Sequence, residues 1–221
     1  MSELQADTDA YLEPTPAGAF YATAAAEGEP ARRLLLGLLA QDASPKLDVQ
    51  RISEWSGLAE TESLELLERL QGLGWLSGMD APIEAPEGSL ESILPGLLEQ
   101  VCEEGKALLA DHQGLFLAAS GIHHETAEAL SALSADLLDL SLRHHGLLAR
   151  NLGRREQAWA LTDAGGNGRL GFWPLHLGPQ RFALVIDGRP CLNQPAFRDL
   201  VWMLARRYTT NDLWEDNENH E

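Results

Sequence analysis

The residues that could carry chemistry are few, and they do not form a recognisable reactive set. His124-Glu125-Thr126-Ala127-Glu128 begins like the paired-histidine helix of zinc proteases, but Glu128 stands where the second histidine is needed. One helical face could offer His124 and Glu128 to a metal, whereas a zinc site needs three or four ligands. We interpret this segment as the solvated start of a helix and predict no metal site.

Other reactive patterns are equally incomplete. Gly165-Gly-Asn-Gly168 is rich in glycine, yet Arg169 follows it where a phosphate-binding loop has lysine and a hydroxyl residue, so a hairpin loop is predicted. Cys102 and Cys191 lie far apart in the sequence and lack the spacing of a disulfide framework or zinc site, which fits a reducing compartment. No serine or cysteine has the neighbours of a nucleophile. We therefore predict a protein that is not an enzyme and carries no cofactor.

Two groups of residues suggest contacts with other molecules. Arg143, Arg150, Arg154 and Arg155 gather in a chain whose formal net charge is −18. They could face an acidic partner, a nucleotide phosphate or the acidic ends of this chain, and the alternative is a solvated loop. Leu213-Trp214 stands among acidic residues, which is typical of a docking peptide, although Trp214 could equally be a packing residue.

The overall composition limits the partners. The chain has 221 residues, 34 of them acidic and 16 basic, which disfavours binding to nucleic acid or to anionic lipid. No apolar run approaches the roughly 20 residues of a membrane span, and the acidic N-terminus does not resemble a signal peptide. We expect a cytoplasmic protein without membrane insertion.

Charge and turn residues divide the chain into five parts. Residues 1–30 and 209–221 are acidic and lack a sustained period, and residues 81–89 contain two prolines and a glycine. The predicted organisation is a mobile acidic arm (1–30), a helical module (31–80), a linker (81–89), a larger mixed domain (90–208) and an acidic tail (209–221).

The helical module is predicted from apolar residues at helical spacing. Helices are expected over 31–40, 50–56 and 59–73, with a short strand at 46–49 and another strand starting at Gly74. This order resembles the winged-helix family. DNA-binding members of that family present their third helix to phosphates, but here the exposed side would carry Glu62, Glu65 and Glu68, so nucleic acid is disfavoured.

The larger domain is predicted to alternate helices and strands. Helices are expected over 90–106, 124–145 and 196–208, and strands over 107–110, 115–119, 157–163, 169–175 and 181–187. The run Phe182-Ala-Leu-Val-Ile186 is apolar without alternation, which is typical of a central strand covered on both faces.

This order of elements resembles the roadblock family, which includes dynein light chains. The stretch Ala107-Leu-Leu-Ala-Asp-His-Gln-Gly-Leu-Phe-Leu-Ala118, with the Ala/Leu-rich helix after it, carries the resemblance. His112-Gln113 departs from the family pattern, in which an acidic residue often adjoins the glycine. The resemblance implies an α+β fold: a profilin-like five-stranded antiparallel sheet with helices on both faces, preceded here by the small, mainly α, winged-helix-like domain.

The resemblance also implies a homodimer in which long helices and sheet edges join, acting as a platform for a Ras-like small GTPase, as roadblock dimers often do in bacteria. The residues of the expected interface are Leu130, Leu133, Leu137 and Leu140 on the long helix, and Trp159 on the following strand. Their apolar arc is wider than one sheet should cover. We predict a dimeric adaptor or regulator. The alternative is a winged-helix transcription regulator whose C-terminal domain senses a ligand.

Overall fold

The computed structural model describes residues 10–153 and 158–209. The elements are, in chain order, β1 (Tyr11–Pro14), α1 (Pro16–Thr23), α2 (Pro30–Leu39), α3 (Val49–Ser56), α4 (Glu60–Gly72), β2 (Leu76–Met79), α5 (Leu90–Gln100), β3 (Ala107–Asp111), β4 (Phe116–Ser120), α6 (His124–His145), the π-helical turn η1 (Gly146–Asn151), β5 (Trp159–Thr162), β6 (Gly168–Leu177), β7 (Gln180–Asp187) and α7 (Pro195–Tyr208). No helix in the described ranges has the length and apolar character to cross a bilayer.

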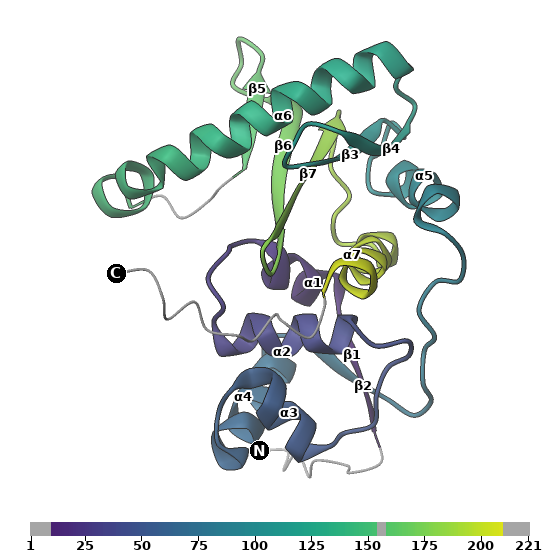
Figure 1. The fold of residues 1–221 in the computed structure, drawn as a ribbon, viewed down its shortest axis with the longest axis vertical. Coiled ribbons are helices and arrows are strands. Elements are labelled where there is room, and N and C mark those ends of the chain that lie inside the picture. The colour runs from purple at the N-terminus through teal and green to yellow at the C-terminus, as the bar shows by residue number, and fades with distance from the viewer. Residues whose placement is uncertain (1–9, 154–157, 210–221) are drawn as a thin grey trace.

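The larger part of the chain is an α+β fold around a five-stranded antiparallel sheet with the order β4-β3-β7-β6-β5. The predicted central strand is confirmed, because β7 lies between β3 and β6 and residues 182–186 are buried. In Figure 1, α6 crosses the upper part of the sheet, while α1 to α4 gather below it. The fold and element order expected for residues 90–208 are confirmed.

Side-chain alternation along the strands builds a core on each face of the sheet. Leu108, Val185 and Phe172 are register partners on neighbouring strands, and they form a small cluster with Ala127 of α6. Leu109 and Leu184 point to the other face and belong to a larger cluster with α5 and α7. The two faces follow from the period of two in a strand.

The N-terminal helices begin and end where local chemistry places them. The carboxylate of Asp48 accepts hydrogen bonds from the backbone N–H groups of Gln50 and Arg51, which caps α3. Gly57 ends α3 in the left-handed conformation at φ 70°. Helices α2, α3 and α4 thus occur in the predicted order, and the winged-helix assignment of this region stays a prediction.

The prediction of a mobile arm over residues 1–30 is wrong for residues 11–23, which form β1 and α1, while residues 1–9 lie outside the described ranges. Strand β1 is the antiparallel partner of β2, and Leu12 is fully buried. The Thr15 hydroxyl accepts a hydrogen bond from Gly18 N and caps α1. Pairing between strands far apart in sequence has no local signal, so periodicity alone missed it.

Two other predicted bounds are also corrected. The strand expected at 46–49 is only an isolated bridge between Lys46 and Tyr11, because Asp48 already caps α3. The helix expected to reach residue 106 ends at Gln100. The helix expected over 124–145 is confirmed as α6, and the finding that was not predicted is that Gly146 keeps a right-handed helical conformation and continues into η1.

The two parts of the chain share one hydrophobic core. The cluster that contains α5 and α7 also contains Leu12 and the leucines of α2. The segment expected to be a linker is packed, since Ala85 is buried and its N–H donates to Asp42 O at 2.9 Å. Arg198 forms an ion pair with Glu13, and Trp202 Nε1 donates to Gln41 O at 2.8 Å. Helix α7 is therefore the joint between both parts.

Candidate protein-interaction surface

Helix α6 packs on the sheet through small side chains. The buried residues of the helix are Ala127, Ser131, Ser134, Leu138 and Ser141. The hydroxyls of Ser131 and Ser134 donate to the carbonyl oxygens four residues earlier, at 2.8 and 2.7 Å, so they need no partner from the sheet. Small residues let the helix lie close to the strands, and the leucines of α6 other than Leu138 lie on its flanks.

The predicted interface leucines lie along one flank of α6, which meets the start of strand β5 where Leu137 lies near Trp159. Leu130 and Leu137 pack against the small core of this face, together with Trp159, and they are half-buried. Leu140 is also half-buried, and Leu133 is 41% exposed. We call Leu130, Leu133, Leu137 and Leu140 the leucine flank. The structure thus brings the predicted residues together and leaves their outer side uncovered.

Strand β5 is an open edge beside the leucine flank. It pairs with β6 on one side only, and within the described chain it has no second strand neighbour. Ala160, Leu161 and Thr162 are exposed, with Leu161 at 59%. Trp159 Nε1 donates to the Ser141 hydroxyl, which ties this edge to α6. An uncovered edge with an exposed leucine can receive another strand.

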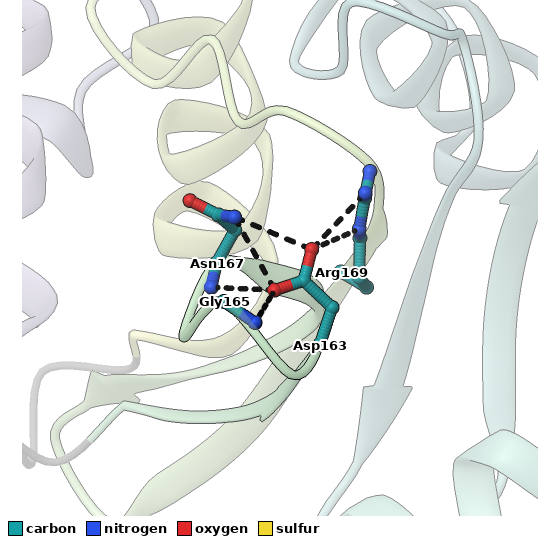
Figure 2. A network of polar contacts seen from close by, with 4 residues as sticks. All are labelled: Asp163, Gly165, Asn167 and Arg169. Carbon is teal, nitrogen blue, oxygen red and sulfur yellow. Dashed lines mark hydrogen bonds and ion pairs between the residues drawn. The ribbon is translucent and has the colours of Figure 1, made fainter.

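The loop that follows β5 is held by Asp163 (Figure 2). The Asp163 carboxylate accepts hydrogen bonds from Gly165 N at 2.9 Å, Asn167 N at 3.0 Å and Arg169 Nε at 3.1 Å. These bonds, that of the Asn167 backbone above all, hold the pKa of Asp163 below its usual range. The hairpin-loop prediction is confirmed. The role of Asp163 was missed, although an aspartate before a glycine-rich turn is a known turn signal.

The described arginines of the predicted basic group lie at the end of α6 and in η1. Arg143 and Arg150 are exposed, and the Arg150 guanidinium lies over Gly146, where a Cβ would be 2.9 Å from Nη2. Arg154 and Arg155 lie outside the described residues, as do Leu213 and Trp214. Three exposed leucines surround this segment: Leu142, Leu147 and Leu152. The sequence did not point to Leu147 and Leu152, because the helix was expected to end at Gly146.

A cavity of about 90 Å³ lies between the C-terminal half of α6 and the β6–β7 hairpin. Its apolar lining comes from Leu138, Leu142 and Pro174, and we call it the hairpin cavity. His176 lines it too, and burial, together with the positive charge of Arg181, lowers the pKa of His176 to about 4. No sequence signal pointed to this cavity, because its walls come from α6, the hairpin and the α1–α2 loop.

The remaining sequence motifs are the His124–Glu128 segment and the acidic side of α4. His124 Nε2 lies 3.5 Å from Glu128 Oε1, and both side chains are exposed, as expected of a solvated helix start. No group of three or more metal-binding side chains occurs in the part of the chain that the structure describes. The outer side of α4 exposes Glu62, Glu65 and Glu68, as predicted. Such a surface repels phosphate.

Comparison with known proteins finds likeness at the level of solved structures. No model of a protein family matches the chain, and no curated protein matches it. The roadblock/LC7 domain from Streptomyces avermitilis is 16% identical, with a TM-score of 0.36, over 54% of this chain and 93% of its own. Myxococcus xanthus MglB is 15% identical, with a TM-score of 0.37, over 54% and 94%. The gliding protein MglB from Thermus thermophilus is 18% identical, with a TM-score of 0.37, over 57% and 96%. These roadblock/LC7 domain structures match the C-terminal part of the chain.

Proposed function

We propose that the protein is a non-enzymatic adaptor that forms a homodimer through the leucine flank of α6 and the open edge of β5. The observations that carry this proposal are the exposure of Leu133 on the leucine flank and of Leu161 on β5, together with the packing of Leu137 and Trp159 in one cluster. A second copy would cover both at once, because a two-fold axis places the same flank and the same edge opposite each other. Pairing of two β5 strands would also satisfy backbone groups that the single chain leaves to water.

The dimer is tested by size-exclusion chromatography with light scattering on the full chain. We expect a mass of about twice 24.1 kDa at micromolar concentration. The double variant Leu133→Asp/Leu161→Asp should be a folded monomer, because it places carboxylates in the proposed contact. The matched control is Leu73→Asp, since Leu73 is 50% exposed at the end of α4, and it should remain a dimer. A monomeric wild-type protein would contradict the proposal.

We infer further that the dimer acts in the cytoplasm on a Ras-like small GTPase. This part rests on the resemblance of residues 90–208 to the roadblock family, whose members serve as platforms for such GTPases. The test offers the full-length protein to the small GTPases of its source organism, each loaded with GDP or a non-hydrolysable GTP analogue. We expect one of them to be retained in one nucleotide state, with a changed rate of hydrolysis or nucleotide release. Absence of both effects for every GTPase tested would refute the inference.

A further inference from the structure

The hairpin cavity lies on the flank of α6 opposite the leucine flank. Leu142 follows Leu133 by nine residues, which is two and a half turns at 3.6 residues per turn, so the two side chains leave the helix on opposite sides. Leu142 is 61% exposed and forms part of the cavity wall. A second copy on the leucine flank would therefore leave Leu142 and the cavity uncovered. This surface needs a different occupant.

The polar surroundings of the cavity favour an acidic occupant. Arg181 lines the cavity from β7, and the Arg150 guanidinium lies over Gly146, one turn beyond Leu142. Arg181 Nη2 lies 3.7 Å from Asp139 Oδ1, and His145 Nε2 lies 3.9 Å from Glu27 Oε1. Both distances are longer than a hydrogen bond, so each basic side chain has only a loose contact with one carboxylate. Arginine has five N–H donors and can accept further carboxylates.

Helix α7 ends near the end of the sheet where the cavity lies. The ring of Tyr208, the last residue of α7, is 4.9 Å from the ring of Phe182. Phe182 is the direct neighbour of Arg181, whose register partner across the hairpin is His176 of the cavity. Tyr208 thus contacts a strand that borders the cavity, on the opposite face of the sheet.

The chain beyond Thr209 has the chemistry that the cavity requires. Residues 210–221 contain five carboxylates and neither lysine nor arginine, with Leu213 and Trp214 among them. An extended chain advances ~3.4 Å per residue, so Leu213 can lie up to ~14 Å from Thr209. The cavity volume of about 90 Å³ is below the roughly 150 Å³ that holds a benzene ring, which favours an aliphatic side chain over an indole.

We propose that residues 210–221 dock on their own chain, with Leu213 in the hairpin cavity, Trp214 over Leu142, and the neighbouring carboxylates toward Arg150 and Arg181. The docked segment covers the exposed leucine that a second copy would leave bare, and it neutralises basic groups on an otherwise acidic protein. An acidic partner that binds this end of α6 must first displace it. This proposal is independent of dimer formation, because the two surfaces lie on opposite flanks of α6.

The experiment places a photoreactive p-benzoylphenylalanine at position 214 of the full chain and maps the cross-links by peptide mass spectrometry. We expect intramolecular adducts on α6 and the β6–β7 hairpin, at Leu142 or Pro174 above all, in the species with the mass of one chain. Leu142→Glu should lower their yield about tenfold, because it removes apolar contact and adds a repelling charge. Leu213→Ser, which alters only the docking segment, should lower the yield similarly.

The matched control is Leu161→Glu, which changes a leucine of nearly equal exposure, 59% against 61%, on the open edge of β5. It should leave the adducts unchanged even where it abolishes a dimer, so failure of this proposal is distinguishable from failure of the dimer. Three results would overturn the docking of residues 210–221: adducts at other positions, adducts only between two chains, or an adduct yield that Leu142→Glu does not change.

Discussion

At the scale of single residues, the protonation state of the buried His176 affects stability. It is 7% exposed in the β6–β7 hairpin, and its register partner is the cation Arg181. Burial first, then the charges of Arg181 and Arg32, lower its pKa from 6.5 to about 4, while Glu27 opposes the shift. The folded protein therefore holds His176 neutral over a range of pH in which the unfolded chain protonates it.

The expected consequence is a loss of stability on mild acidification. Between pH 6.5 and about 4 the unfolded chain binds more protons at this histidine, so the free energy of unfolding falls as the pH falls, by at most about 3 kcal/mol. His176→Gln should lose much of the difference between pH 7 and pH 5 in urea unfolding, whereas His144→Gln, at an exposed position, should keep it. Equal pH dependence in wild type and His176→Gln would contradict the buried neutral histidine.

At the scale of elements, the two sides of α6 differ in size of side chain and in contacts. The side toward the sheet consists of alanine, serine and one leucine, and a void of only about 10 Å³ remains around Ser134, Leu138 and Phe172. The flanks carry the larger leucines: Leu130 and Leu137 pack in part against the core of this face, whereas Leu133 and Leu142 are exposed. The helix is thus close to the strands because its inner residues are small, and its contact surfaces are free for the same reason.

A substitution that enlarges the inner side should lift α6 from the sheet. Ser134→Leu adds a side chain where there is no room for it, and we expect a loss of about 1 to 3 kcal/mol in the free energy of unfolding. Ala129→Leu makes a similar addition at an exposed position of the same helix and should change stability by less than about 0.5 kcal/mol. Chemical denaturation measures the free energy of unfolding of both variants. A similar loss of free energy in the two would rule out close packing of α6 on the sheet.

At the scale of the whole molecule, the N-terminal helices and the sheet are coupled through α7. Their leucines belong to one cluster, and the ion pair between Glu13 and Arg198 is almost completely withdrawn from solvent. Arg206 Nε also donates to Asp42 at 3.1 Å. A chain with a shared core is expected to unfold in one cooperative step.

The coupling predicts how a change in β1 affects the remainder of the protein. Glu13→Ala leaves Arg198 with Asp199 as its remaining carboxylate, and we expect a loss of about 2 kcal/mol. Circular dichroism and tryptophan fluorescence should report the same unfolding midpoint before and after the change. Glu65→Ala, on the exposed side of α4, serves as the control with little effect. Two separate transitions would mean that the two parts fold independently.

The sequence by itself determined the elements that have a strong period. The leucines of α4 and α6, the apolar run of β7 and the turn at Gly57 each depend on neighbours within a few residues, so their signals are local. The same signals predicted the leucine flank, because an arc wider than one sheet can be read from helical spacing alone. Helical spacing likewise predicted an acidic exposed side for α4.

Only the tertiary structure decided what depends on contacts between distant segments. Strand β1 forms because β2, more than sixty residues later, is its antiparallel partner. Helix α1 forms because α7 packs against it. The hairpin cavity needs α6, β6, β7 and the α1–α2 loop at once, and no window of the sequence contains them all. Local propensity specifies which segments are helices or strands, whereas the free energy of burying apolar surface specifies which of them meet.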